Sequence, residues 1–292
     1  MDLSLVISTR NRAPQLERCL ESLKKLRYAG PWELVVVDNG STDETPGVIA
    51  RFGEEFPQGL VTAVERRTGA GHARNTGWRL ARGEIIVFTD DDCYPAPDYL
   101  ETTARCFREN PGLGFVGGRI LLFDPEDYPT TIQISHVGQT IRPGDFITTG
   151  LIHGANCAFR RAALEAAGGF DPPFGAGALY ASCEDVDLIT RVSANGWEGA
   201  YDPRPLVYHH HGRKTSAEAA RLTKLYDRGR GAFYAKCILN PALRPVYLKN
   251  WYWLTRYQPI RITLRELVAG LEFLTRSCFL MKTRERGNLA GD

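Results

Sequence analysis

Three features that mark other classes of protein are missing from this sequence. The seven cysteines are scattered and include no C-x-x-C pair, so they indicate neither a disulfide framework nor a zinc cluster. The N-terminus runs at once into an apolar segment, residues 3–7, without the basic and long apolar regions of a signal peptide. Charged residues interrupt the apolar helical stretch at 262–281, so it is not a simple membrane span. We therefore expect a protein of the reducing cytosol.

Charge is divided unevenly along the chain. Over all 292 residues the formal net charge is only +2. Residues 1–212 hold 20 Lys and Arg against 28 Asp and Glu, whereas residues 213–292 hold 16 against 6. The basic region favours an anionic partner, either the inner face of the cell membrane or an acidic acceptor, although a solvated helix face would show the same excess. We do not expect nucleic acid as a partner.

Short apolar strands alternate with helical stretches as far as residue 123. The expected strands are 3–8, 33–38, 60–65, 84–89 and 115–122, and the expected helices are 14–26, 45–52, 71–81 and 97–109. This alternation predicts an α/β fold with a mostly parallel central sheet flanked by helices. Residues 124–212 lose the regular pattern, and helical stretches at 216–237 and 262–281 follow.

Polar residues follow three of the expected strands at their carboxyl ends. These segments are STRNR at 8–12, DNGSTD at 38–43 and DDD at 90–92. Because ligands of parallel sheets bind outside the carboxyl ends of the strands, we expect the site at this edge.

The acidic triplet needs a compensating charge, since three adjacent carboxylates repel one another. Oxygen ligands of this kind suit Mg²⁺ or Mn²⁺ bridging a diphosphate. The alternative is a solvated loop in which one Asp caps the next helix.

The order of the motifs resembles a known family. They are VISTRNR, VVVDNGSTDET, GAGHARNTG, FTDDDC, HGANCAFRR, GGFD, CEDVDLITR and VYHHHG, between residues 6 and 212. The sequence resembles the family 2 inverting glycosyltransferases, which use a nucleotide-sugar donor on the glycosyltransferase A fold. The resemblance implies a catalytic domain at 1–212, with a nucleotide-binding half at 1–123 and an acceptor-side half at 124–212. A basic, helical C-terminal region at 213–292 would follow, and its 226–232 stretch looks like segments found after this domain in some members.

The resemblance also implies roles for particular residues. Asp90 would face the nucleotide ribose, and Asp92 would bind a Mn or Mg cation together with His209, or with His211 as the alternative. Surface histidines are the alternative explanation of the three-histidine run. The expected nucleotide-sugar-binding residues are Thr9, Arg10, Asp38, Asn39, Arg74, Asp90 and Asp91. The expected acceptor-side residues are Gly154, Ala155, Asn156 and Glu184.

Asp185 carries the catalytic role in this comparison. Family members place a general base at the Asp of this motif, while Asp187 would have a structural or capping role. The alternative is an acidic cluster favoured by the dipole at the N-terminus of the helix predicted at 186–195.

Two positions depart from the family pattern. Asn39 stands where many members carry a second acid, and Arg10 stands where an aromatic residue is common, although a guanidinium can also stack on a base. Asp38 would read the base or form an Asx-turn with the residues that follow. Uracil and thymine both stay open as the donor base.

The C-terminal region also contains aromatic residues interleaved with Lys249 and Arg256. They are Tyr247, Trp251, Tyr252, Trp253 and Tyr257. An amphipathic core helix explains this pattern, and so does a membrane-interface or sugar-stacking surface.

The sequence thus predicts a cytosolic, metal-dependent inverting glycosyltransferase. It would move one sugar from a UDP or dTDP sugar to an acceptor hydroxyl during glycan or glycolipid assembly. The acceptor would be a glycan, a lipid-linked molecule or a small molecule. One alternative is a sugar-nucleotide nucleotidyltransferase, although the 8–12 segment has no glycine for a phosphate loop. The other is a noncatalytic carbohydrate-binding module that keeps the fold.

Overall fold

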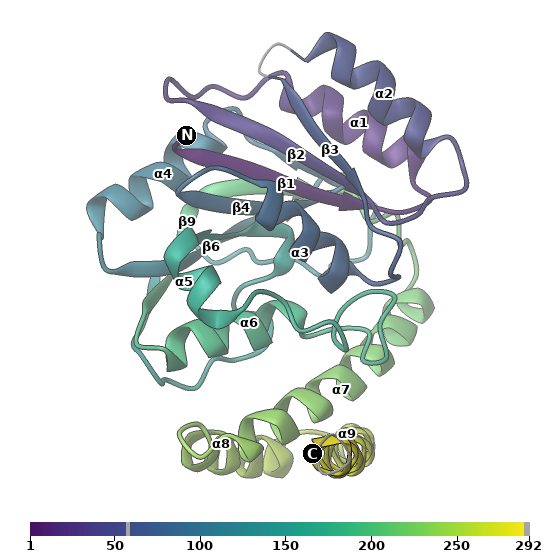
Figure 1. Ribbon diagram of the computed structural model, residues 1–292, viewed down its shortest axis with the longest axis vertical. Coiled ribbons are helices and arrows are strands. Elements are labelled where there is room, and N and C mark those ends of the chain that lie inside the picture. The colour runs from purple at the N-terminus through teal and green to yellow at the C-terminus, as the bar shows by residue number, and fades with distance from the viewer. Residues whose placement is uncertain (57–58, 289–292) are drawn as a thin grey trace.

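The structure is a computed structural model that describes residues 1–56 and 59–288, in which one mixed sheet forms the centre (Figure 1). The strand order is β3-β2-β1-β4-β8-β6-β9-β5, with β7 paired to β9. The strands are β1 (Leu3–Thr9), β2 (Trp32–Asp38), β3 (Leu60–Val64), β4 (Ile85–Asp90), β5 (Cys93–Pro95), β6 (Leu113–Leu122), β7 (Gln139–Ile141), β8 (Cys157–Arg160) and β9 (Glu198–His209). The α/β fold predicted from the sequence is confirmed.

Helices cover both faces of this sheet. They are α1 (Ala13–Leu23), α2 (Thr45–Glu55), α3 (Ala70–Leu80), α4 (Tyr99–Glu109), α5 (Arg161–Ala167), α6 (Glu184–Ala194), α7 (Ser216–Leu239), α8 (Arg244–Tyr257) and α9 (Ile260–Asn288), with a 3₁₀ turn at Gly154–Asn156. Side chains alternate along a strand, so Leu5 and Ile7 of β1 pack in the core under α1, α2 and α4, whereas Val6 packs in the core that contains α3 and α6.

The sheet is mixed: its β3-β2-β1-β4 part is parallel, as predicted, whereas β8, β5 and β7 pair with their neighbours in antiparallel fashion. β1 pairs in parallel with β2 and β4, and β6 pairs in parallel with β9. The short strand β8 lies between β4 and β6 and is antiparallel to both. The sequence did not predict β8, because its four residues end a long irregular segment and show no strand period of their own. Since β8 runs backward, the turn at Gly154–Asn156 lies at the carboxyl edge, where Thr89 donates a hydrogen bond to the Ala155 carbonyl.

The C-terminal helices form a layer against residues 124–212. In Figure 1, α7 runs from the sheet edge down to α8 and α9. α7 and α9 approach very closely, since a Cβ atom on Gly231 would lie inside the van der Waals distance of the Glu266 backbone. None of the helices in the described part of the chain is both long and apolar enough to cross a membrane.

Candidate active site

A cavity of about 560 Å³ opens at the carboxyl edge of the sheet, as the sequence predicted. It collects side chains from β1, α3, β4, the turn before β8, the start of α6, the end of β9 and α7. Twelve of the predicted site residues line it: Thr9, Arg10, Asn39, Arg74, Asp90, Asp91, Asp92, Gly154, Ala155, Glu184, Asp185 and His209.

Each carboxylate of the acidic triplet lies against an arginine. Asp90 pairs with Arg74 at 2.8 Å. Arg12 contacts both of the others, with Nε 3.3 Å from Asp91 and Nη2 2.6 Å from Asp92. The chain therefore tolerates three adjacent acids because two arginines from other elements lie against them.

Asp91 and Asp92 differ in protonation behaviour. Burial raises the pKa of Asp91 to about 7, although Arg12 and the Thr9 hydroxyl, which donates to Asp91 at 2.6 Å, oppose the rise. Asp92 is equally buried, but its contacts with His209 and Arg12 outweigh burial and lower its pKa to about 2. Asp92 is therefore the member of this buried pair that favours the ionised form a metal ion requires.

Asp92 and His209 meet because β5 pairs with β9, which places Cys93 directly opposite His209. His209 Nε2 lies 3.4 Å from Asp92 Oδ1, and the other ring nitrogen lies 3.2 Å from the Thr131 carbonyl. Although burial opposes it, the contact with Asp92 raises the pKa of His209, so we assign a proton to Nε2 facing Asp92 and another to Nδ1 facing the Thr131 carbonyl. A cation bound at Nε2 would take the place of the proton there. Ligand atoms of Asp92, Cys93 and His209 lie within 4.8 Å of one another. A carboxylate and an oriented imidazole fit a divalent cation.

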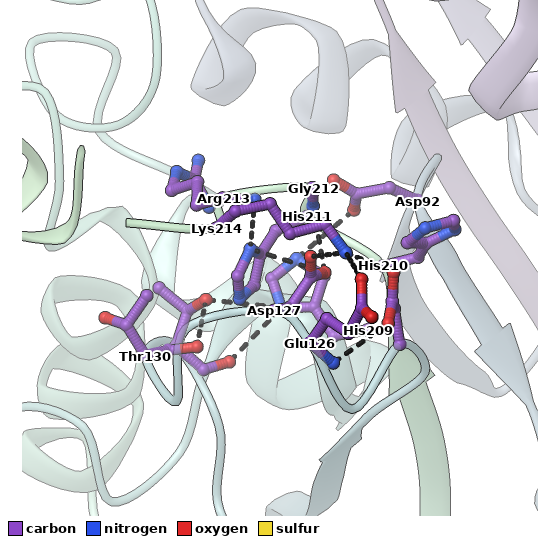
Figure 2. Close-up of polar contacts among 12 residues, drawn as sticks. Asp92, Glu126, Asp127, Thr130, His209, His210, His211, Gly212, Arg213 and Lys214 are labelled. Atoms are coloured by element: carbon purple, nitrogen blue, oxygen red, sulfur yellow. Dashed lines mark hydrogen bonds and ion pairs between the residues drawn. The ribbon is translucent and has the colours of Figure 1, made fainter. Parts of the chain in front are cut away.

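His211, the alternative ligand, packs its ring edge-to-face against that of His209, with centroids 5.1 Å apart, but it pairs with Asp127 and not with Asp92 (Figure 2). Its side chain is fully buried, with Nδ1 3.7 Å from Asp127 Oδ2. The same nitrogen accepts a hydrogen bond from the Arg213 backbone, and Asp127 accepts another from Gly212. His211 and Asp127 thus fix the 209–213 segment, while His209 faces the cavity.

Arg74 connects the acidic triplet with the acidic pair at the start of α6. Its side chain is only 6% exposed, and its two terminal nitrogens bind Asp90 at 2.8 Å and Glu184 at 2.7 Å. The ion pairs satisfy a guanidinium that would otherwise be buried without a partner. Arg74 was expected to bind the nucleotide sugar, and it also holds the end of β4 against the start of α6.

Asp185 lies beside the turn that precedes β8. Its Oδ2 accepts a hydrogen bond from Gly154 N at 2.8 Å, and its Oδ1 accepts one from Val186 N at 2.7 Å. The N-cap of α6 is Cys183, so Asp185 is not the capping residue, although it does bond one N–H of the first turn. Burial raises the pKa of Asp185, which makes the carboxylate a better proton acceptor near neutral pH.

Two predicted residues lie outside the cavity lining, and a third has its amide engaged. Asp38 is buried and accepts from Ser41 N at 2.9 Å, which is the turn contact considered as its alternative role. Asn156 donates to the carbonyls of Arg119 and Pro205 and accepts from Tyr99. Asn39 reaches the cavity, but its amide bonds Glu65 O, Arg67 O and Gly69 N. The amides of Asn39 and Asn156 are thus engaged in hydrogen bonds that hold together the segments around the cavity.

The lining residues that were not predicted include five with an arginine, histidine or tyrosine side chain. They are Arg12, His153, Arg213, Tyr226 and Arg230. Arg12 stood in the VISTRNR motif, and Tyr226 and Arg230 stood in the stretch that looked like segments of other family members. Nothing in the local pattern of 213–230 shows that it faces the cavity, because α7 reaches the site only through the tertiary fold. Burial lowers the pKa of His153 to about 4, so this side chain is neutral at physiological pH.

This sheet, with an acidic triplet at its edge and a second acidic pair across the cavity, defines a glycosyltransferase of the A-type fold. The model of glycosyl transferase family 2 matches residues 4–168, more than half of the chain, and the chain belongs to this family. Family membership favours a glycosyltransferase over the nucleotidyltransferase alternative.

Curated relatives carry glycosyltransferase names. The glucosyl-dolichyl phosphate glucuronosyltransferase of Haloferax volcanii is 26% identical over 221 residues, which cover 72% of this chain and 69% of that protein. The pre-mycofactocin glycosyltransferase of Mycobacterium tuberculosis is 30% identical over 216 residues, 72% of this chain and 43% of that protein. Glycosyltransferase AglE of Haloferax volcanii aligns over 40% of this chain and 39% of its own length, at 30% identity. This chain therefore spans less than half the length of several relatives that it matches.

Solved structures share the fold over almost the whole chain. A mannosyltransferase from Pyrobaculum calidifontis, in complex with GDP-Man and Mn²⁺, matches 98% of this chain and 80% of its own, with a TM-score of 0.64 and 25% identity. Residues 1–349 of Staphylococcus aureus TarS in complex with UDP-GlcNAc match 92% of this chain and 79% of that one, with a TM-score of 0.64 and 16% identity. The second match supports the fold alone.

Proposed function

We propose that the protein is a metal-dependent inverting glycosyltransferase that moves one sugar from a nucleoside diphosphate to an acceptor hydroxyl. The observation behind this proposal is that Asp92 and His209 face one side of a single cavity while Asp185 lies in its acceptor-side wall. We propose UDP or dTDP as the donor nucleotide, and the GDP-Man complex of the structural relative adds GDP sugars to the candidates. The acceptor would belong to glycan or glycolipid assembly in the cytosol.

The chemistry divides between the two sides of the cavity. Asp92 and His209 would hold the cation, which when bound supplies Lewis-acid stabilisation of the departing diphosphate. Asp185 would take the proton of the acceptor hydroxyl while the new bond from that oxygen to the anomeric carbon forms. The bond from the anomeric carbon to the diphosphate breaks on the opposite face, and the diphosphate leaves with the electron pair.

The arginines of the cavity would bind the anionic donor. Arg12, Arg74 and Arg230 pair with carboxylates, whereas no carboxylate stands among the described contacts of Arg10 and Arg213. These two are therefore available to a diphosphate. We propose that residues 1–212 form the catalytic unit and that 213–292 is an appended region whose α7 completes the cavity.

The test is a panel of UDP, dTDP and GDP sugars with Mn²⁺ or Mg²⁺, monitored for nucleoside diphosphate release. We expect release with one donor class, and a loss of roughly 10²-fold or more in the variant Asp92→Asn, because Lewis-acid stabilisation provides several kcal/mol. Asp98→Asn is the matched control, since Asp98 is an exposed carboxylate outside the cavity.

Two outcomes would contradict the proposal. One is turnover of Asp92→Asn near that of the wild type with the same metal. The other is thermal stabilisation by a donor without any release of nucleoside diphosphate, which would support the noncatalytic binding module.

A further inference from the structure

The outer surface of α8 and α9 exposes an unusual number of large apolar side chains. Tyr257 is 81% exposed and Ile260 is 71% exposed. We define the α8–α9 face as Leu248, Tyr252, Trp253, Tyr257, Ile260, Leu264, Leu267, Val268 and Leu271, all of them exposed. Single exposed apolar residues need no explanation, but a group of this size on two neighbouring helices, which meet where Trp251 donates to Glu266, marks an interaction surface.

The α9 part of this face is one continuous stripe. Its members recur at spacings of three and four residues, so they share one side of the helix. Glu266, Ala269 and Gly270, on the other side, are buried against α7. On the side of α9 that faces the protein, Glu266 makes buried polar contacts. On the opposite side, aliphatic side chains face the solvent.

Exposed positive charge accompanies the apolar side chains. Lys249, Arg256 and Arg261 are exposed, and no carboxylate stands among their described contacts. The nearby acids are occupied, since Glu266 pairs with Arg230, and Glu272 pairs with Arg228. The face thus presents uncompensated cations beside apolar groups, which complements an anionic surface with an apolar interior.

The aromatic residues of α8 fit the same partner. The rings of Trp253 and Tyr257 stack with centroids 6.2 Å apart, and the Arg256 guanidinium lies 5.7 Å from the Trp253 ring. Trp and Tyr concentrate at the boundary between lipid headgroups and hydrocarbon because one end of each ring is apolar and the other is polar. The sequence left open whether these aromatic residues belong to a core helix or to a surface. Tyr247 is a core residue, whereas Tyr252, Trp253 and Tyr257 are exposed.

The α8–α9 face lies close to the acceptor side of the cavity. Arg230 lines the cavity and binds Glu266 of α9, with Nε to Oε1 at 2.5 Å. Leu264, Leu267 and Val268 project from the opposite side of the same turns of α9. α9 therefore lies between the cavity-lining Arg230 and the exposed stripe.

We propose that the α8–α9 face rests on an anionic lipid bilayer and inserts its apolar side chains among the headgroups. The face would hold the acceptor side of the cavity close to the membrane, where an amphiphilic acceptor would present its hydroxyl. The statement about the acceptor rests on the proposed glycosyltransferase function, whereas the proposed binding to the bilayer does not.

Sedimentation of the full chain with vesicles tests the docking. The vesicles are phosphatidylcholine alone or phosphatidylcholine mixed with anionic phosphatidylglycerol, each at low and high salt. We expect binding to the anionic vesicles that weakens at high salt, because salt screens the exposed charges. The double variant Arg256→Gln/Arg261→Gln should bind roughly 30-fold more weakly, since each cation near the surface contributes about fivefold.

Apolar variants separate insertion from simple charge attraction. Leu264→Ser/Val268→Ser should weaken vesicle binding by on the order of tenfold or more, because two side chains no longer leave water. Ile134→Ser/Val137→Ser is the matched control, since these residues are also exposed and lie outside the face. Arg27→Gln/Arg105→Gln removes the same charge from the catalytic half and should leave binding unchanged.

Three results would overturn the proposal. They are no binding to anionic vesicles at low salt, equal losses in the face and control variants, and a lipid-free dimer by analytical ultracentrifugation that Leu264→Ser/Val268→Ser dissociates. The last result would assign the face to a second copy of the chain. Donor binding in lipid-free solution tests the proposed function separately, and the face variants should leave it unchanged.

Discussion

The three acids of the triplet show how neighbours of one residue type acquire different properties. Asp90 faces Arg74, Asp91 contacts the Thr9 hydroxyl, and Asp92 contacts His209 and Arg12. These acids are adjacent in the chain, but their partners come from β1, the segment between β1 and α1, α3 and β9. The chemistry of each residue is therefore set by contacts that are distant in sequence.

Asp185 is the residue whose proposed role can be isolated by one substitution. Asp185→Asn should retain binding of donor and Mn²⁺ but lose transfer to the acceptor by about 10²–10⁴-fold, because an amide cannot accept the proton. The measurements are transfer rate and donor affinity.

An unfolding measurement on the same variant guards against a structural explanation. Asp185 accepts hydrogen bonds from Gly154 and Val186, and an Asn would present its NH₂ group to one of these donors. A stable variant whose transfer is within a few-fold of the wild type would remove Asp185 as the base and make Glu184 the next candidate.

At the scale of elements, the connections from strands to helices hold the site in shape. The segment between β3 and α3 depends on Glu65, whose side chain is 9% exposed and accepts hydrogen bonds from Arg67 and from Thr76 of α3. Asn39 at the end of β2 bonds the same segment. The wall that contains Gly69 and Arg74 is thus fixed by polar contacts of two buried side chains.

The pKa of Glu65 gives a test of this connection. Hydrogen bonds from Arg67 and Thr76 lower the pKa from 4.5 to about 2, in opposition to burial. An acid whose pKa is lowered by folding stabilises the folded state above its unfolded pKa, and this contribution disappears as the pH falls from about 4.5 to about 2. The melting temperature of Glu65→Gln should therefore fall less than that of the wild type as the pH is lowered through this range.

The control for this experiment is Glu54→Gln, which neutralises an exposed carboxylate on α2. Thermal unfolding of the three proteins across the acid range is the measurement. If the melting temperature of Glu65→Gln falls as steeply with pH as that of the wild type, Glu65 does not stabilise the fold through its ionised form.

At the scale of the whole molecule, α7 joins the C-terminal helices to the catalytic part. Tyr226 and Arg230 line the cavity, and buried Asp227 pairs with Arg230 and with Arg265 of α9. Two glycines permit this packing, because Cβ atoms on Gly229 and Gly231 would overlap Ser182 and Glu266. The basic region predicted as a separate appendage therefore also forms part of the site.

Substitution of a helix glycine measures how much this packing contributes. Gly231→Ala should destabilise the protein by about 1–3 kcal/mol, because the added methyl group must push α7 and α9 apart. Gly53→Ala is the control within a helix, since its Cβ would lie 3.6 Å from Leu60 and meet no closer atom. The control should stabilise the protein by about 0.5–1 kcal/mol through helix propensity. Urea unfolding is the measurement, and equal effects of the two substitutions would contradict close α7–α9 packing.

Most of the predicted site residues line the cavity, and several of them were expected there because of where strands end. Thr9 and Asp90 were expected at the carboxyl ends of parallel strands, and the cavity contains both. Asp38 was expected on the same ground but turns back toward Ser41. A carboxylate after a strand looks the same in sequence whether it bonds a ligand or its own turn, so this distinction requires side-chain geometry.

The sequence by itself determined the layers of this protein and the edge that carries the site. The periods of two in strands and 3.6 in helices are local properties, and so is the position of polar residues after a strand. Only the tertiary structure decided that β8 enters antiparallel, that His209 and not His211 faces Asp92, and that α7 closes the cavity. These outcomes depend on contacts between segments far apart in the chain, such as Cys93 beside His209, and local sequence patterns do not specify such contacts.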